Sequence, residues 1–196
     1  MPRKTSFQRK TKETDIKIGL NIDGRGKTKI FSPIPFFNHL LDNFAKHGSF
    51  DLTIKASGDT KTDQHHIIED IGICLGKAFK KSLGDKRGIN RAGYFVFPLD
   101  ESLPVVAVDI SGRAFLNFNC KFKKQKIDEL DCNLIKEFFW GFVRNLEATL
   151  HIRMLCGEND HHKAESIFKA FGKTMKMACS KDKRLLKELP STKGLI

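Results

Sequence analysis

The chain has 196 residues, of which 40% are hydrophobic and 30% charged, and its formal net charge is +12. This length supplies one ample core or two small ones, and this composition excludes a chain that is disordered throughout. No apolar run approaches the length of a membrane span, and residues 1–12 lack the apolar segment of a secretory signal, so we expect no membrane association.

Apolar periodicity predicts five elements in the first half of the chain. Alternating apolar residues are typical of half-buried strands, and apolar residues three and four apart are typical of helices. Gly48 and Gly84 are typical of helix C-terminal ends. The expected elements are strands over 16–22, 27–31 and 50–54 and helices over 35–48 and 65–83.

The second half of the chain repeats this order of elements. The expected elements are strands over 106–110, 116–120 and 150–154 and helices over 134–146 and 161–179. Apolar positions recur at a constant offset, since Phe44 corresponds to Phe142 and Leu52 corresponds to Leu150. This correspondence indicates an internal duplication.

The duplication predicts an α+β fold with helices packed between two sheets. Residues 13–92 and 93–182 would be duplicated β-β-α-β-α half-domains, and residues 183–196 would form a C-terminal tail. All of them would belong to a single domain, 1–196.

One pattern, two adjacent histidines followed by a glutamate, occurs twice, as His65-His66-Ile67-Ile68-Glu69 and as His161-His162-Lys163-Ala164-Glu165. On a helix, residues four apart share a face whereas neighbours point about 100° apart. The first histidine and the glutamate of each block can therefore hold one ion, and the second histidine cannot join them.

Exchange between the two blocks would satisfy every histidine. One ion would take His65, Glu69, His162 and Glu137, and the other would take His161, Glu165, His66 and His39. Imidazole and carboxylate ligands suit manganese, iron or zinc, and an octahedral ion would keep open positions for substrate and water. Open positions indicate catalysis rather than a structural role.

A single block of this kind is about as often an accidental helix N-terminus with solvated histidines as a metal site. Two copies favour the metal interpretation, and His39 joins the four histidines of the blocks. His47 is a weaker candidate because it could simply end a helix, but it lies two helical turns from His39.

Three segments offer donors to an anion, namely Arg91 after Gly88-Ile89-Asn90, Arg113 after Ser111-Gly112, and the tail Ser191-Thr192-Lys193-Gly194. Each is weak alone, since an exposed arginine in a turn is usually solvated. The five cysteines include no C-x-x-C pair and lie in apolar stretches where a free cysteine packs as a small hydrophobe, which favours a reducing cytoplasm.

Two other functions stay open from these residues. A binuclear metallohydrolase acting on a phosphate ester would use the same metals and anion donors. A nucleic-acid-binding module would account for the +12 charge and the 17 phenylalanines. Those phenylalanines mostly fall at the apolar-periodic positions of a core, and no known RNA-binding motif accompanies them.

Nine blocks, in order from about residue 11 to residue 194, resemble the imidazoleglycerol-phosphate dehydratases. They are Phe36-Phe37-Asn38-His39, Asp63-Gln64-His65-His66-Ile67-Ile68-Glu69-Asp70, Gly88-Ile89-Asn90-Arg91, Pro98-Leu99-Asp100-Glu101, Ser111-Gly112-Arg113, Leu150-His151-Ile152, Gly157-Glu158-Asn159-Asp160-His161-His162-Lys163-Ala164-Glu165, Phe168-Lys169-Ala170 and Ser191-Thr192-Lys193-Gly194. No fused phosphatase domain accompanies them, so the resemblance is to a monofunctional member.

The resemblance implies dehydration of D-erythro-imidazole glycerol phosphate to imidazole acetol phosphate plus water, in L-histidine biosynthesis. It implies two Mn²⁺ per active site, which hold the substrate as imidazolate. It implies a cytoplasmic lyase with a duplicated fold like domain 2 of ribosomal protein S5. The partners implied are a small-molecule phosphate substrate and further copies of the chain, in a 24-mer with active sites between subunits, and neither nucleic acid nor membrane.

The resemblance also assigns residues. The metal ligands implied are His39, His65, His66, Glu69, Glu137, His161, His162 and Glu165, although some members have histidine where this chain has Glu137. The substrate contacts implied are Glu13, His39, His47, His65, Glu69, Arg91, Arg113, His161, Lys169, Ser191, Thr192 and Lys193. The group that moves each proton is not identified, and the candidates are Glu13, Glu69 and Glu165.

Overall fold

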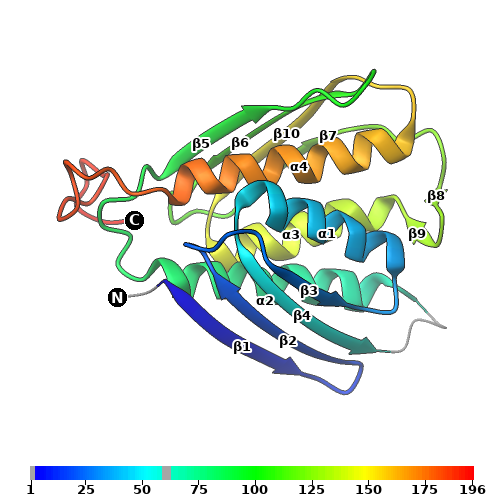
Figure 1. The fold of residues 1–196 in the computed structure, drawn as a ribbon, viewed down its shortest axis with the longest axis horizontal. Coiled ribbons are helices and arrows are strands. Elements are labelled where there is room, and N and C mark those ends of the chain that lie inside the picture. The colour runs from blue at the N-terminus through cyan, green and yellow to red at the C-terminus, as the bar shows by residue number, and fades with distance from the viewer. Residues whose placement is uncertain (1–2, 59–62) are drawn as a thin grey trace.

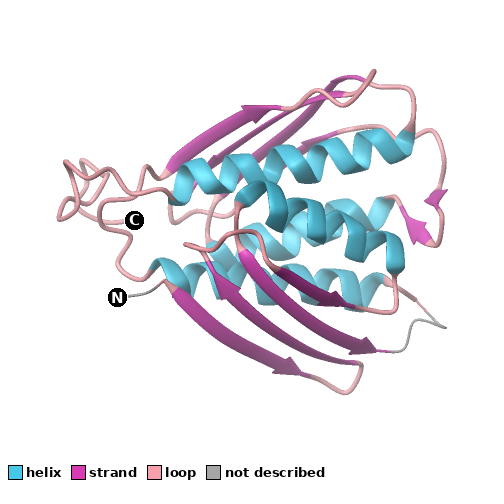
Figure 2. Cartoon of the chain, in the orientation of Figure 1, coloured by secondary structure: helices cyan, strands magenta, loops and turns pink. Residues whose placement is uncertain are grey.

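The computed structural model describes residues 3–58 and 63–196 of the chain, and its elements are shown in Figures 1 and 2. The helices of this part are α1 (Pro35–Gly48), α2 (His65–Leu83), α3 (Asn133–Leu146) and α4 (Asp160–Cys179). The first half contains the strands β1 (Lys4–Lys10), β2 (Thr14–Asn21), β3 (Thr28–Phe31) and β4 (Asp51–Gly58). The second half contains the strands β5 (Ala92–Val96), β6 (Leu103–Asp109), β7 (Phe115–Asn119), β8 (Lys126–Ile127), β9 (Leu130–Asp131) and β10 (Thr149–Cys156).

The two halves build sheets of the same topology. The first sheet has the order β1-β2-β4-β3 and the second has the order β5-β6-β10-β7, while β8 and β9 form a separate short hairpin. In each large sheet the last pair is parallel, β3 with β4 and β7 with β10, and the other pairs are antiparallel. This shared order is what a duplicated chain predicts.

The helices lie between the two sheets, as Figure 1 shows. Helices α1 and α2 contact the first sheet, and α3 and α4 contact the second. Across the middle, α2 packs against α3 and α1 packs against α4. The predicted α+β class, with helices enclosed by two sheets, is therefore confirmed.

Each large sheet has one strand more than the sequence predicted, and the second half also contains the unpredicted hairpin of β8 and β9. Apart from that hairpin, each half has the order β-β-β-α-β-α. The additional strands, β1 and β5, both lie at a sheet edge. An edge strand tolerates charged residues because one of its sides has no partner strand. Strand β1, Lys-Thr-Ser-Phe-Gln-Arg-Lys, therefore lacks the apolar alternation by which β2 was found. Strand β1 precedes residue 13 and so lies outside the predicted repeat 13–92. The repeat limits 13–92 and 93–182 stay a prediction.

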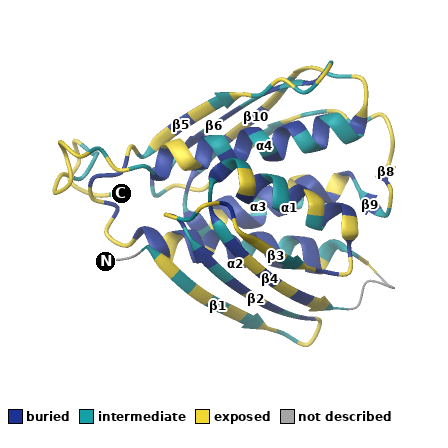
Figure 3. Ribbon diagram, viewed as in Figure 1, coloured by how far each residue is buried: buried dark blue, intermediate teal, exposed yellow. Residues whose placement is uncertain are grey.

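One continuous core contains residues of both halves, and Figure 3 shows the buried residues on the inward faces of the elements. Its centre is a cluster of phenylalanine rings, in which the centroids of Phe44 on α1 and Phe171 on α4 lie 4.8 Å apart. Gly172 permits this close approach, since a Cβ atom there would lie 2.3 Å from the carbonyl oxygen of Phe44. Helices α1 and α4 are consequently in backbone contact.

Figure 1 shows all four helices beginning at one end of the molecule, beside β8 and β9, and the C-terminal segment at the opposite end. Both histidine blocks begin a helix, His65 in α2 and His161 in α4. The blocks therefore lie at the end of the molecule that is remote from the tail.

Three of the five cysteines are buried as predicted, and burial raises the pKa of Cys74 and Cys179 to about 12. Cys156 differs, because it is exposed at the irregular end of β10, where the pairing with β6 shifts register. No helix in the described part of the chain combines the length and the apolar character needed to cross a bilayer.

Candidate functional site

Three predicted metal ligands meet where α1 packs against α4. The Nε2 atom of His161 lies 3.2 Å from Glu165 Oε2, and the Nε2 atom of His39 lies 3.7 Å from Glu165 Oε1. One ligand atom of each residue can be chosen so that all three lie within 4.8 Å of one another. We call His39, His161 and Glu165 the α1–α4 cluster. It contains three of the four ligands predicted for one ion.

Local interactions position this cluster. The side chain of Asn159 accepts a hydrogen bond from the backbone N–H of His161 and so begins α4. The ring of Phe36 packs against that of His161, with centroids 4.8 Å apart. On Glu165, burial favours the neutral carboxyl, but Lys169, with Nζ 2.7 Å from Oε1, and the two histidines together hold its pKa below the ordinary value. Glu165 is therefore a carboxylate.

A buried ion pair holds the start of α4 to the loop that precedes β8. The ammonium group of Lys163 donates to Asp160 Oδ1 at 2.8 Å, and both side chains are almost wholly buried. The other oxygen of Asp160 accepts from the backbone N–H groups of Lys123 and Lys124. Burial alone would raise the pKa of Asp160, but these donors hold it below its ordinary value.

Two further predicted substrate contacts, His47 on α1 and Lys169 on α4, both lie against Phe97. The ring of His47 meets the ring of Phe97 edge to face, and the Nζ atom of Lys169 lies over Phe97 at 5.8 Å from its centroid. Burial, Lys169 and Lys173 hold the pKa of His47 below its ordinary value. His47 is therefore a neutral imidazole at neutral pH.

The first histidine block forms a separate group on α2. His65 Nε2 lies 3.6 Å from Glu69 Oε2, as helical spacing predicted. The ring of His66 points elsewhere, and its Nδ1 atom lies 3.4 Å from Oε2 of Glu13, which precedes β2. Glu137 lies half-buried on α3 and belongs to neither of the two groups of potential metal ligands that the described residues form.

His162, the second histidine of the other block, contacts a carboxylate that the sequence did not identify as part of the site. Its Nδ1 atom donates to Glu101 Oε2 at 2.9 Å and lies 3.8 Å from Asp100 Oδ2. Glu101 Oε1 accepts from the backbone N–H groups of Glu158 and Asn159. The hydrogen bond to His162 and these N–H groups lower the pKa of Glu101, and Glu101 raises that of His162. The signal in the sequence was the acidic pair Asp100-Glu101 just before β6. Its position corresponds to that of Glu13, which stands just before β2 in the first half.

One chain therefore brings the eight predicted ligands together only in part. The α1–α4 cluster holds three of them, and His65 and Glu69 form a pair. His66 and His162 each contact a carboxylate outside the predicted sets. The exchange of second histidines between the two blocks is not formed within a chain, and the ligand sets stay a prediction.

The predicted anion-binding residues lie together. The guanidinium group of Arg91 pairs with both carboxylate oxygens of Asp109 and donates to the carbonyl of Pro190 in the tail. Ile196 lies against the glycine before Arg113, since a Cβ atom on that glycine would be 2.9 Å from its carbonyl carbon. The side chain of Arg113 is exposed. The tail itself turns on Ser191, whose hydroxyl donates to the carbonyl of Leu195 and accepts from the N–H of Lys193.

These anion-binding residues are far from the α1–α4 cluster of the same chain. The backbone N–H of Arg91 donates to the carbonyl of Ala178, in the last turn of α4, whereas His161 is in the first turn. At 1.5 Å per residue, helix α4 separates them by about 25 Å. One small molecule cannot contact both within one chain.

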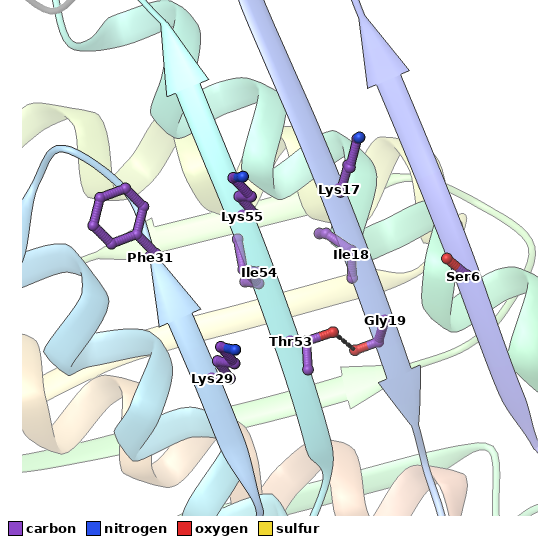
Figure 4. A pocket seen from close by; sticks show the side chains of 9 residues that line it. All are labelled: Ser6, Lys17, Ile18, Gly19, Lys29, Phe31, Thr53, Ile54 and Lys55. Atoms are coloured by element: carbon purple, nitrogen blue, oxygen red, sulfur yellow. Dashed lines mark hydrogen bonds between the residues drawn. The ribbon is translucent and has the colours of Figure 1, made fainter.

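A hollow of about 460 Å³ lies on the outer face of the first sheet, away from the helices (Figure 4). Lys17, Lys29, Lys55 and the exposed ring of Phe31 line it, and Thr53 donates to the carbonyl of Gly19 across its floor. It contains no histidine or carboxylate, so it is not part of the candidate site.

The fold and the α1–α4 cluster define an α+β enzyme with imidazole and carboxylate groups at the helix ends. A profile of the imidazoleglycerol-phosphate dehydratase family matches residues 32–175. Proteins of that name from Koribacter versatilis and Hydrogenovibrio crunogenus are each 50% identical to this chain over 194 residues, covering 99% of it and 100% of the relative. The chain belongs to the imidazoleglycerol-phosphate dehydratase family.

Solved structures agree with this assignment. The crystal structure of IGPD from Pyrococcus furiosus in complex with (S)-C348 is 37% identical, has a TM-score of 0.83, and covers 97% of this chain and 100% of that one. The imidazoleglycerol-phosphate dehydratase of Staphylococcus aureus is 36% identical, with a TM-score of 0.80 and coverage of 91% and 99%. The family comprises hydro-lyases, and membership indicates dehydration of imidazole glycerol phosphate in histidine biosynthesis.

Proposed function

We propose that this chain dehydrates D-erythro-imidazole glycerol phosphate to imidazole acetol phosphate with two manganese ions per active site, which hold the substrate ring as imidazolate. Family membership supports the reaction. The observation that supports the metal chemistry is the α1–α4 cluster, in which two imidazoles and a carboxylate converge without any thiolate.

The residues present fit manganese. Histidine nitrogen and carboxylate oxygen are ligands that this ion takes, and the carboxylate of Glu165 is ionised before any ion binds. His39, His161 and Glu165 would hold one ion, and His65, Glu69 and Glu137 would contribute to the other. Manganese, when bound there, supplies the Lewis acidity that favours loss of a proton from the imidazole ring of the substrate.

The second histidine of each block would come from another copy of the chain. His66 and His162 point away from the ligand pairs of their own blocks, toward Glu13 and Glu101. The separation of about 25 Å between His161 and Arg91 likewise favours an active site shared between copies. The proposal therefore includes a homo-oligomer with inter-subunit sites, for which the resemblance implies 24 subunits.

The basic end of another copy would bind the phosphate. Arg113 has an exposed guanidinium group suited to two oxygens of one phosphate. Arg91 donates to the carbonyl of Pro190, which supports a role in placing the tail so that residues 191–193 reach the same group. Holding the phosphate would orient the substrate chain along His47 and Lys169, which contributes to rate by lowering the entropic part of the barrier.

Carboxylates of the chain would move the protons. Glu13, Glu69 and Glu165 are the candidates, and Glu13 is the most exposed of the three. The free thiols of all five cysteines fit a cytoplasmic enzyme. The proposal includes neither a nucleic-acid partner nor a membrane partner.

Incubating the purified protein with Mn²⁺ and imidazole glycerol phosphate tests the reaction. We expect ketone formation that stops when the metal is removed by a chelator and returns when Mn²⁺ is restored. Release of inorganic phosphate without ketone would instead establish a metallohydrolase and contradict the proposal.

Mixed assemblies test the shared site. Co-expressed His161→Ala and Arg113→Ala chains should regain, at low substrate concentration, activity that neither variant has alone, because some sites then combine an intact metal end with an intact phosphate end. Activity no greater than the sum of the two variants would place each site within a single chain.

A further inference from the structure

Glu101 is held by several donors and in turn contacts a predicted metal ligand. Its Oε1 atom accepts from the backbone N–H groups of Glu158 at 3.1 Å and Asn159 at 2.8 Å, and from the hydroxyl of Ser102 at 3.1 Å. These donors fix the orientation of the carboxylate. Its Oε2 atom therefore faces His162, with Nδ1 at 2.9 Å.

A carboxylate oxygen can only accept a hydrogen bond, so the Nδ1 atom of His162 carries the proton. In a neutral imidazole the other nitrogen, Nε2, then has a free lone pair. A metal-binding histidine commonly donates its second ring nitrogen to a carboxylate in this way, which fixes both the tautomer and the ring orientation.

The first half of the chain contains a matching arrangement. Oε2 of Glu13 lies 3.4 Å from Nδ1 of His66, which is the second histidine of the other block. Glu13 directly precedes β2 and Glu101 stands two residues before the start of β6, and these strands occupy the same place in the two sheets. The duplication thus provides a carboxylate for the Nδ1 atom of each second histidine.

We propose that Glu101 is a positioning residue that holds His162 as its Nδ1–H tautomer, so that Nε2 is presented to a manganese ion bound mainly by another copy of the chain. The inference rests on the proposed function for the identity of the ion. The tautomer itself is a property of the metal-free chain and can be measured independently of that function.

Glu101→Gln is the decisive variant, because it keeps the shape of the side chain and reverses one hydrogen bond. The two backbone N–H groups require an oxygen at the Oε1 position, so the amide NH₂ group must take the place of Oε2. That group donates to His162 Nδ1 and moves the ring proton to Nε2, the nitrogen that would bind the ion. The side-chain oxygen that accepts from the N–H groups of Glu158 and Asn159 is retained in this variant, so we expect the fold to be preserved.

The first measurement is a ¹⁵N NMR spectrum of the imidazoles in metal-free protein, recorded at a pH above the pKa of His162. We expect the Nδ1–H form of His162 in the wild type and the Nε2–H form in Glu101→Gln. Retention of the wild-type tautomer in the variant would overturn the proposal.

The second measurement is Mn²⁺ binding, followed by the EPR signal of the free ion. Loss of such a supporting partner typically lowers metal affinity about 10- to 100-fold, and we expect that loss for one of the two ions in Glu101→Gln. The maximal turnover rate should then recover as Mn²⁺ is raised to saturation, which a general loss of folding would not allow.

Asp100→Asn is the matched control. Asp100 is exposed, lies 3.8 Å from the same Nδ1 atom, and could hold an ion together with Glu101 and His162. If Glu101 acts only by positioning His162, this substitution leaves both the tautomer and the Mn²⁺ affinity unchanged. A loss of affinity equal to that of Glu101→Gln would show that the three residues ligate an ion themselves, and would refute the positioning role. A wild type that has the Nδ1–H tautomer but neither binds Mn²⁺ nor forms ketone would instead refute the proposed function.

Discussion

Replacing Gly172 by alanine should push α1 away from α4 and weaken the α1–α4 cluster. The added Cβ atom would lie 2.3 Å from the carbonyl oxygen of Phe44 and 2.9 Å from the backbone nitrogen of Gly48. Both are backbone atoms of α1, so they cannot rotate away as a side chain would. Relief requires the helices to separate by about 1 Å, to the distance of ordinary van der Waals contact.

Overpacking of this kind costs about 1–3 kcal/mol. For a chain of this length each kcal/mol lowers the melting temperature by about 2–4 °C, so we expect G172A to melt about 2–12 °C below the wild type in circular dichroism. The same separation moves His39 away from His161 and Glu165. We expect the Mn²⁺ affinity of that ion to fall about tenfold, which corresponds to a loss of ~1.4 kcal/mol.

Gly93→Ala is the control for this experiment. A Cβ atom at Gly93 on β5 would lie 2.4 Å from the carbonyl oxygen of Thr174, on the side of α4 that faces the sheet. It should lower the melting temperature by a similar amount without changing the spacing of α1 and α4. Equal Mn²⁺ affinities in G172A and G93A would refute the link between helix spacing and the cluster, and a wild-type melting temperature in G172A would refute the backbone contact itself.

Other predictions concern single residues. His161→Ala should lower the metal content measured by atomic absorption and abolish turnover, and a variant that keeps both ions and full activity would show the ligand assignment to be wrong. Arg113→Ala should raise the KM for the phosphate substrate with the metal content unchanged, and a lowered metal content would contradict its assignment to the phosphate. Asp160→Asn should cost about 3–5 kcal/mol of unfolding free energy in urea at pH 7, because it leaves the buried ammonium group of Lys163 unpaired. The folded pKa of Asp160 is depressed, so this contribution is present above the unfolded pKa of about 3.9 and is lost as the pH falls through the folded value. A difference between wild type and variant that persists undiminished at the lowest pH of the series would contradict this account.

The spacing of residues along the sequence predicted those features that depend on a single face of a single helix or strand. The alternation of Ile16, Ile18 and Leu20 placed β2, and the four-residue spacing within each block placed His65 beside Glu69 and His161 beside Glu165. These outcomes follow from the periods of strands and helices, and neighbouring elements do not alter them.

The features that the sequence did not predict depend on contacts between different helices, strands and loops. Strand β1 is largely polar and lies at a sheet edge, and nothing within its seven residues indicates that β2 is its partner. Glu101 meets His162 only because the loop before β6 lies against the start of α4. The distance between Arg91 and His161 could not be predicted from residue spacing either, because it depends on Arg91 lying against the last turn of α4.

The common direction of the four helices aligns their backbone dipoles. Each helix N-terminus carries roughly half a positive charge and each C-terminus roughly half a negative charge. Carboxylates such as Glu69 and Glu165 lie near the positive ends, and basic residues stand in the last turn of every helix, at the negative ends. These side-chain charges are opposite in sign to the helix ends beside which they stand, so they oppose the backbone dipoles. They therefore stabilise an arrangement in which all four helices point the same way.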